Sequence, residues 1–256
     1  MSDQSSPERR VPALSVFFPA YNDAPSLPSL IEKTFAVLSQ HADTFEVIVV
    51  NDGSRDNTAT VLRDLGARFG PTLRVVEHTE NQGYGAALRS GLKAVRYELV
   101  FYTDGDSQYD VGELPLLLRE MEEGVGLVNG YKLERNDPWH RVCIGWIYNR
   151  FARVLFQIRL RDIDCDFRLM RTEIVEQLGL QSTTGSICVE LVHGIELSGC
   201  GVREVGVHHY PRLYGRSQFF RIPSLLTTFG QLIDLYARQV LWPPVRRVRE
   251  IMRWAR

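Results

Sequence analysis

The chain has 256 residues, of which 44% are hydrophobic and 24% are charged, and its formal net charge is −1. This length accommodates one large domain or a domain with an appendage, and the composition is that of a folded globular protein. The near-neutral charge argues against nucleic-acid binding. The four cysteines have no Cys-x-x-Cys spacing, which argues against a zinc knuckle and against a disulfide framework.

Short apolar runs alternate with helical patterns through the first half of the chain. These runs predict strands at 15–18, 45–50, 73–76, 99–102 and 125–128. Their alternation with helices predicts an α/β fold with a doubly wound, mostly parallel sheet. A capping box formed by Ser29 and Glu32 predicts the start of the first helix, and Ser54 or Asp56 is expected to cap the second.

The pattern changes in the second half of the chain. Residues 143–161 predict an amphipathic helix, which is either a core helix with a solvated face or an interfacial helix. A compact run at 164–170 precedes a predicted helix at 172–178, and residues 205–210 predict a further strand.

The two ends of the chain differ from the middle in composition. Residues 1–12 are polar and lack the apolar core of a secretory signal, so we expect a disordered tail on a cytoplasmic protein. Residues 221–256 predict a basic, amphipathic helical appendage that docks on a membrane surface or on a partner. No apolar window there reaches the roughly 18 residues of a spanning helix. The main domain is therefore expected at 13–220.

Polar turns follow three of the predicted strands, at 20–23, 51–54 and 104–108. Because the carboxyl ends of parallel strands meet at one edge, and ligands bind there, these turns are expected to form one site. Asp104 and Asp106, with Gly105 between them, can face one Mg²⁺ or Mn²⁺ ion, and Gln108 can add an amide oxygen. The alternative is an acidic turn that only caps a helix. The two neighbouring acidic turns favour the metal site.

The second turn places Asp52 where a carboxylate can accept hydrogen bonds from a base or a ribose. The alternative role, a helix cap, can be filled by Ser54 or Asp56. In the first turn, Tyr21 offers a flat ring for a base, and Asp23 is either a ligand group or a turn former. The glycine-rich run at 81–91 lacks the spacing of phosphate-binding loops, so we expect it to pack a helix on the sheet, with Asn81 and Gln82 bracing the site.

Six segments together resemble family 2 glycosyltransferases, which have the GT-A fold, and in particular the dolichyl- and polyprenyl-phosphate sugar synthases. The segments occur in the family's order between about Leu14 and Ser217, at 19–23, 50–54, 81–87, 104–106, 166–169 and 212–217. The resemblance implies a metal-dependent, inverting transfer of a sugar from a nucleotide diphosphate-sugar to a polyprenyl or dolichyl phosphate. It also implies a peripheral enzyme at the cytoplasmic face of a membrane, where an integral membrane protein can dock the tail.

The resemblance assigns roles to individual residues. It implies a nucleotide-sugar site made of Pro19, Tyr21, Asp23, Val50, Asp52, Asp104, Gly105, Asp106, Lys132, Arg212 and Gln218. Within this set Asp106, Lys132 and Arg212 are the expected catalytic residues. The expected metal ligands are Asp104 and Asp106 of this set together with Gln108. The acceptor phosphate is expected at Arg141, Arg168, Arg216 and Ser217. Three positions depart from the family's usual residues: Asp23 replaces a glutamate, Lys132 an arginine and Gln218 a lysine.

A phosphate acceptor also agrees with the residue types present. A hydroxyl acceptor normally requires a general base, whereas a phosphate monoester is already an anion at neutral pH and requires positive charge instead. The second half of the chain supplies that charge in its arginines. Two alternatives remain open: transfer to a polysaccharide or protein acceptor, and a non-catalytic subunit that binds a sugar nucleotide.

Overall fold

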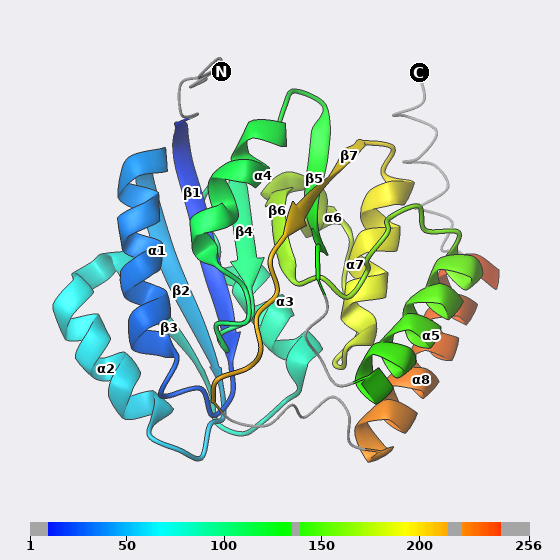
Figure 1. The fold of residues 1–256 in the computed structure, drawn as a ribbon, viewed down its shortest axis with the longest axis horizontal. Coiled ribbons are helices and arrows are strands. Elements are labelled where there is room, and N and C mark those ends of the chain that lie inside the picture. Colours follow the sequence, from blue (N-terminus) through cyan, green and yellow to red (C-terminus); the bar gives the residue numbers. More distant parts are fainter. Residues whose placement is uncertain (1–9, 135–138, 215–221, 242–256) are drawn as a thin grey trace.

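The computed structural model describes residues 10–134, 139–214 and 222–241, without the side chains of 139–143, 222–223 and 225. A seven-stranded sheet in the order β3-β2-β1-β4-β6-β5-β7 carries helices on both faces (Figure 1). The strands are β1 (Val11–Ala20), β2 (Ala42–Asp52), β3 (Leu73–His78), β4 (Leu99–Thr103), β5 (Val125–Lys132), β6 (Phe167–Arg171) and β7 (Gly201–Val207). The α-helices are α1 (Leu27–His41), α2 (Thr58–Phe69), α3 (Tyr84–Ala94), α4 (Leu114–Glu120), α5 (Trp139–Phe156), α6 (Thr172–Gln177), α7 (Ser186–Leu197) and α8 (Ile222–Tyr236). Short helical turns are η1 (Gly70–Thr72), η2 (Val111–Glu113) and the π-helical η3 (Ala237–Leu241).

The sheet is parallel except for one strand. Strands β3, β2, β1 and β4 are parallel neighbours, as are β5 and β7, whereas β6 runs antiparallel to both β4 and β5. The doubly wound, mostly parallel α/β fold and the five strands predicted in the first half are confirmed. The compact run at 164–170 contains a strand that was not predicted. The strand predicted at 205–210 begins earlier and ends at Val207.

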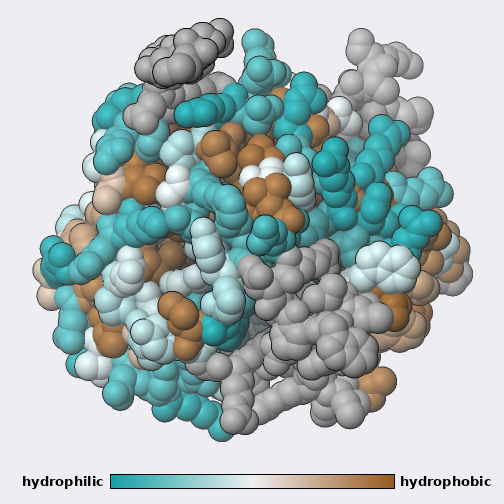
Figure 2. All heavy atoms as spheres, in the orientation of Figure 1, coloured by the Kyte–Doolittle hydropathy of each residue, from teal (hydrophilic) through white to brown (hydrophobic). Residues whose placement is uncertain are grey.

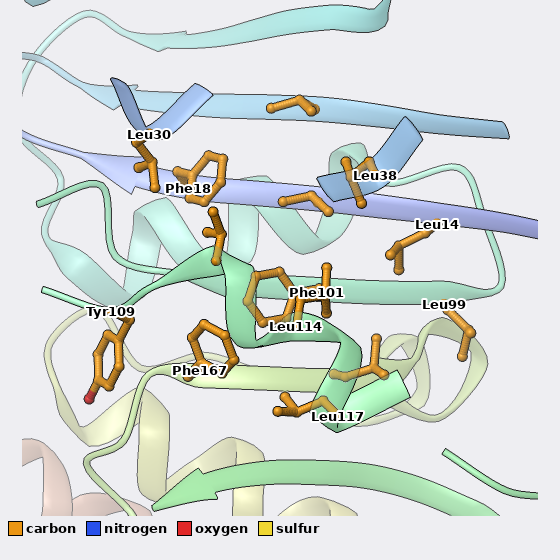
Figure 3. Close-up of a cluster of buried hydrophobic side chains, with 14 of the residues drawn as sticks. Leu14, Phe18, Leu30, Leu38, Leu99, Phe101, Tyr109, Leu114, Leu117 and Phe167 are labelled. Atoms are coloured by element: carbon orange, nitrogen blue, oxygen red, sulfur yellow. The ribbon is translucent and has the colours of Figure 1, made fainter. Parts of the chain in front are cut away.

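Two hydrophobic cores lie on the two faces of the sheet, because successive side chains of a strand point in opposite directions. In β1, Leu14 and Phe18 pack toward α1 and α4, whereas Phe17 packs on the other face with residues of α3 and α7. Figure 3 shows the first of these cores, in which Phe101 and Phe167 from neighbouring strands lie beneath α4. Strands covered on both faces read as continuous apolar runs, which is why they were recognisable in the sequence.

The first helix does not begin at the predicted capping box. Helix α1 begins at Leu27, two residues before Ser29, with a proline in its first turn, where the missing N–H costs nothing. Ser26 precedes the helix, and its hydroxyl donates to the carbonyl oxygens of Asp23 at 2.9 Å and Gly105 at 2.7 Å. At the start of α2, the predicted residue Asp56 does take part, since its Oδ1 accepts the backbone N–H of Thr58 at 3.0 Å, although Asn57 occupies the N-cap position.

Helices α5 and α8 lie side by side at one end of the sheet (Figure 1), where the rings of Phe151 and Phe229 approach to 5.9 Å. Each helix buries one face in the second core, through Ala152 and Phe156 of α5 and through Leu232 and Leu235 of α8. Within the described part of the chain, no helix has the length and apolar character needed to span a bilayer. Most of the predicted N-terminal tail, at 1–9, and the basic end of the chain, at 242–256, lie outside the described residues.

Candidate active site

The polar turns meet at the point where the winding of the sheet reverses. Strand β1 has β2 on one side and β4 on the other, so the turns after β1 and β4 lie next to each other at the carboxyl edge. The backbone N–H of Gly105 donates to the carbonyl oxygen of Pro19 at 3.1 Å. A Cβ atom at Gly105 would lie 2.9 Å from that oxygen, so the close approach of the two turns requires a glycine.

Asp104 is a carboxyl group of this edge whose pKa is perturbed by its surroundings. Burial raises its pKa well above the ordinary value, and the charges of Asp166 and Asp106 raise it further. The hydroxyl of Tyr84, at the start of α3, donates to Asp104 Oδ1 at 2.9 Å. Three carboxyl groups therefore share one electronegative region, in which a cation is electrostatically favoured.

Asp166 belongs to this region, although the sequence assigned it no role. Strand β6 pairs with β4 in antiparallel register, with Thr103 opposite Phe167, so the next residues outward are Asp104 and Asp166. Asp166 Oδ1 accepts the hydroxyl of Tyr102 at 3.1 Å and lies 3.2 Å from Cys188 Sγ. Asp166 is the first residue of the 166–169 segment, but its position beside Asp104 follows only from the pairing of β4 with β6.

Arg168 does not face an acceptor phosphate, so that prediction is wrong. Its side chain is fully buried, and its guanidinium donates to Asn129 Oδ1 at 2.7 Å and to Tyr102 and the Ile163 carbonyl. Arg168 also pairs with Asp166 at 3.2 Å. Because every one of these partners is within the protein, Arg168 fixes the position of Asp166 from beneath the site.

Three residues predicted to act together are in contact at the other side of the acidic turn. The guanidinium of Arg212 pairs with the carboxylate of Asp106, and its Nε donates to Gln108 Oε1 at 3.4 Å. The backbone N–H of Gln108 donates to Asp106 Oδ1 at 3.1 Å. Asp106 is thus held by one cation and by one backbone donor of its own turn.

Lys132, at the end of β5, faces the loop that leads into β6. Its Nζ donates to the Asp164 carbonyl at 2.8 Å and lies 4.0 Å from Asp162 Oδ2. Burial lowers the pKa of Lys132, but nearby negative charges, Asp162 first, outweigh this effect and leave the pKa raised. Burial also raises the pKa of Asp164 to about 7, and the charge of Asp162 adds to this effect. The lysine therefore balances an acidic loop beside the site.

The turn after β1 places Asp23 close to the acidic region. Burial raises the pKa of Asp23 to about 6, the backbone N–H of Tyr21 opposes this shift, and the charge of Asp106 adds to it. Asn22 has a positive φ of 58°, and its Oδ1 accepts the backbone N–H of Arg55 at 2.8 Å. The first and second polar turns are therefore joined directly.

The side chain of Asp52 has several hydrogen-bond partners within the protein. Its Oδ1 lies 2.6 Å from His78 Nδ1 and accepts the N–H of Gln82 at 2.9 Å, and its Oδ2 accepts the N–H of Gly83 at 3.0 Å. Asp52 therefore anchors the 81–83 loop, and the bracing of a ligand site by Asn81 and Gln82 stays a prediction. Val50 is fully buried, so its side chain supports the strand and is not presented to a ligand.

Four predicted site residues are not placed by the structure. The side chain of Arg141 lies outside the described residues, as do Arg216, Ser217 and Gln218. Among the residues that the structure does describe, no group of three or more His, Cys, Asp or Glu side chains is arranged to hold a metal ion without further ligands. The described part of the edge supplies carboxylate and amide oxygens, which suit a cation that also binds phosphate oxygens.

A parallel sheet with an Asp-x-Asp turn at its switch point, backed by a buried arginine network, places this protein in the GT-A-like class of α/β folds. The sequence model described as Glycosyl transferase family 2 matches residues 15–179. The chain belongs to this family.

Two curated relatives cover most of this chain. It is 29% identical over 224 residues to a dodecaprenyl-phosphate galacturonate synthase of Rhizobium johnstonii, covering 87% of this chain and 65% of the relative. It is 32% identical over 222 residues to an undecaprenyl-phosphate 4-deoxy-4-formamido-L-arabinose transferase of Serratia proteamaculans, covering 87% of this chain and 66% of that relative. The chain thus spans slightly less than two thirds of the length of these proteins.

Solved structures confirm the fold. Glucosyl-3-phosphoglycerate synthase from Mycobacterium tuberculosis, in complex with Mn²⁺, uridine diphosphate and glucosyl-3-phosphoglycerate, superposes with a TM-score of 0.66 at 19% identity, covering 91% of this chain and 82% of that one. The same enzyme with Mg²⁺ and uridine diphosphate gives a TM-score of 0.64 at 18% identity, covering 91% and 81%.

Proposed function

We propose that this protein transfers a sugar from a nucleotide diphosphate-sugar to a polyprenyl phosphate, with Mg²⁺ or Mn²⁺ at the acidic turn. The observation that carries the proposal is the turn at the switch point of the sheet, which places the carboxyl group of Asp104 beside Asp106 and pairs Asp106 with Arg212. Carboxylates and a guanidinium at this position suit the opposite needs of a cation and a diphosphate. Membership of glycosyl transferase family 2 supports the same reaction class.

The residues present fit a divalent cation. Asp104 carries a pKa raised by burial and by two neighbouring carboxylates, an arrangement that a cation would relieve. Asp104, Asp106 and Gln108 would supply the protein's oxygen ligands, and Mg²⁺ typically completes such a set with substrate phosphates and water. When bound, the cation neutralises negative charge on the departing nucleoside diphosphate.

The chain's own residues would bind and orient the donor. Tyr21 and Asp23 lie on the turn after β1, where a nucleoside would rest beside the diphosphate. Arg212, paired with Asp106 in the structure, would exchange that carboxylate for the diphosphate as the donor binds. Lys132, already balancing Asp162, would supply positive charge on the acceptor side.

The acceptor is proposed to be a lipid phosphate. The two relatives described above are named for dodecaprenyl-phosphate and undecaprenyl-phosphate, and each match covers 87% of this chain. A phosphate monoester attacks without needing a general base because it is already ionised at neutral pH. One phosphate oxygen would form the new bond to the anomeric carbon while the bond to the nucleoside diphosphate breaks, which inverts the anomeric configuration.

The surface of α5 and α8 would hold the enzyme at an anionic phospholipid bilayer. Large apolar side chains project from both helices: Trp146 is 62% exposed, Val154 65% and Leu226 69%. Figure 2 shows hydrophobic side chains gathered at the edge that these helices occupy in Figure 1. Arg150 and Arg159 add positive charge along α5 and just beyond it. Apolar side chains flanked by arginines are the combination that binds anionic interfaces.

The test is sugar transfer from a panel of radiolabelled UDP- and GDP-sugars with Mg²⁺ or Mn²⁺, with and without polyprenyl phosphate in detergent. The proposal predicts that label enters the lipid only when metal and lipid phosphate are both present. Transfer to a water-soluble glycan or peptide, unaffected by lipid phosphate, would replace the proposed acceptor. Saturable donor binding without transfer to any acceptor would identify a non-catalytic binding subunit.

A further inference from the structure

One side chain of α8, Gln231, contacts several polar groups of a loop, and it lies on the side of that helix opposite to its exposed face. Gln231 Oε1 accepts the backbone N–H groups of Thr183 at 3.1 Å and Thr184 at 3.2 Å, and the hydroxyls of Thr184 and Ser186, both at 3.1 Å. Its Nε2 donates to the Thr183 hydroxyl at 2.7 Å. The 182–186 loop therefore depends on a single amide from another element for several of its polar groups.

The same loop lies against the start of α3, backbone to backbone. The Gly85 N–H donates to the Thr183 carbonyl at 2.9 Å. A Cβ atom at Gly83 would lie 2.6 Å from that carbonyl oxygen, and one at Gly85 would lie 2.5 Å from the Ser182 carbonyl oxygen. Because the two backbones are in direct contact, with no side chain between them, a shift of the loop must displace the start of α3.

The start of α3 reaches the acidic turn directly. Tyr84 lies between the two glycines, and its hydroxyl donates to Asp104 Oδ1 at 2.9 Å. The preceding N–H, from Gly83, donates to Asp52 Oδ2 at 3.0 Å. An unbroken series of contacts thus joins Gln231 to a proposed metal ligand.

The other face of α8 is exposed and apolar. Leu226 is 69% exposed, Phe229 48% and Ile233 52%, at the spacing of one helical face. A second attachment runs from Arg238 Nη1, in η3 directly after α8, to Oε1 of Gln181, the residue before the 182–186 loop, at 2.8 Å. Helix α8 therefore carries the proposed lipid-facing surface on one side and the attachment to the donor site on the other.

We propose that Gln231 is a positioning residue that couples the binding of α8 to a phospholipid surface to the position of Tyr84 and Asp104. This inference rests on the proposed function, because it needs a lipid surface and a donor that binds at Asp104. Lipid contact favours one placement of α8, Gln231 transfers that placement to the 182–186 loop, and the loop fixes the start of α3. Because the contacts of α8 differ between the lipid-bound and the lipid-free protein, nucleotide affinity at the donor site responds to lipid.

The test measures binding of UDP and of GDP, each with Mn²⁺, to the full chain with and without vesicles of phosphatidylethanolamine and phosphatidylglycerol. Vesicles are expected to tighten nucleotide binding by the wild type about fivefold, the low end of usual coupling between sites. Gln231→Leu is expected to bind vesicles like the wild type but to lose this response. Gln231→Glu keeps the acceptor oxygens and should retain most of it.

Matched controls separate this coupling from general damage to α8. Gln239→Leu removes an amide from η3, whose Oε1 accepts no hydrogen bond from the described residues, and should leave the vesicle response intact. Gln231→Leu and Tyr84→Phe should be non-additive in nucleotide affinity, since both act through one series of contacts. Additive effects, or a full vesicle response in Gln231→Leu, would overturn the inference.

The outcomes also separate the two proposals. If wild type never transfers sugar to a lipid phosphate but its nucleotide affinity responds to vesicles through Gln231, the proposed acceptor fails and the coupling stands. If the wild type transfers sugar and Gln231→Leu retains the vesicle response, the coupling fails and the proposed function stands.

Discussion

The carboxyl edge of the sheet and the exposed face of α5 and α8 are built in opposite ways. At the edge, Asp52 accepts from His78, Gln82 and Gly83, and Asp106 is held by Arg212 and a backbone N–H. On the helical face, by contrast, large side chains such as Trp146 and Leu226 are mostly exposed.

This difference shows which region is complete by itself. The edge has fixed its charged groups before any ligand arrives, as expected of a site that must hold a diphosphate in one geometry. The helical face leaves apolar side chains exposed to water. Covering these side chains with another apolar phase would have a favourable free energy. The following predictions test whether charge and apolar area do these separate tasks.

The largest effect is expected from Asp106→Asn. Removing this carboxylate should lower turnover by about 100-fold or more, because the site loses charge that offsets a cation and orients Arg212. Initial rates of sugar transfer at saturating Mn²⁺ measure it. Glu123→Gln removes an exposed carboxylate just before β5, at the opposite edge of the sheet, and should leave turnover unchanged. Turnover of Asp106→Asn equal to that of this control would remove Asp106 from the mechanism.

A change at Asp23 should alter the pH dependence of stability. The pKa of Asp23 is raised to about 6 in the folded protein, so the folded state binds the proton more tightly than the unfolded state. This group therefore lowers the free energy of unfolding as pH rises from about 4 to about 7. Asp23→Asn cannot ionise, so it should gain about 1–3 kcal/mol relative to the wild type across that range. Urea denaturation with a chelator measures this, and a constant difference would contradict it.

The apolar face is tested by Trp146→Ser. Loss of this exposed indole should weaken binding to anionic vesicles about tenfold, since burying a large apolar side chain contributes about 1.5–3 kcal/mol. Vesicle co-sedimentation measures this binding, and nucleotide affinity without vesicles should not change. Leu116→Ser, on α4, is the matched control and should bind vesicles normally. Equal weakening by both substitutions would mean that no specific face is used.

The smallest effect is expected from Tyr84→Phe. This change removes one hydrogen bond to Asp104 while retaining the ring, so Mn²⁺-dependent nucleotide affinity should fall about fivefold. Calorimetric titration measures the fall. Tyr97→Phe, in the connection at the opposite edge of the sheet, should have no effect. If the two substitutions behave alike, the Tyr84 hydroxyl does not orient the metal ligand.

The polar turns of the carboxyl edge in the first half of the chain were predictable from the sequence. The strands and contacts of the second half of the chain were predictable only in part. Strands β1 to β5 were predictable because each contains a short apolar run and the runs alternate with helical patterns. Strand β6 was not, because its antiparallel insertion between β4 and β5 leaves no local signature. The importance of Asp166 depends on that insertion and was missed with it.

The surroundings of Arg168 and Asp52 were not foreseen because both make contacts over a long sequence separation, whereas the misplaced start of α1 was a local error. Arg168 was assigned to an acceptor because its burial by Tyr102 and Asn129 cannot be read from its neighbours in the chain. The partners of Asp52 could not be read from its neighbours because His78 and the 81–83 loop lie on other elements. Charge type was predictable from sequence, whereas the partner of each charge required the fold.

The central claim is that a divalent cation on Asp104 and Asp106 holds the donor diphosphate. Its most direct test is the affinity of UDP and GDP for the wild type and for Asp106→Asn, with Mn²⁺ and with a chelator. We predict binding by the wild type that requires Mn²⁺ and is largely lost in Asp106→Asn. Equal affinity with and without the metal, or unchanged affinity in Asp106→Asn, would contradict the account.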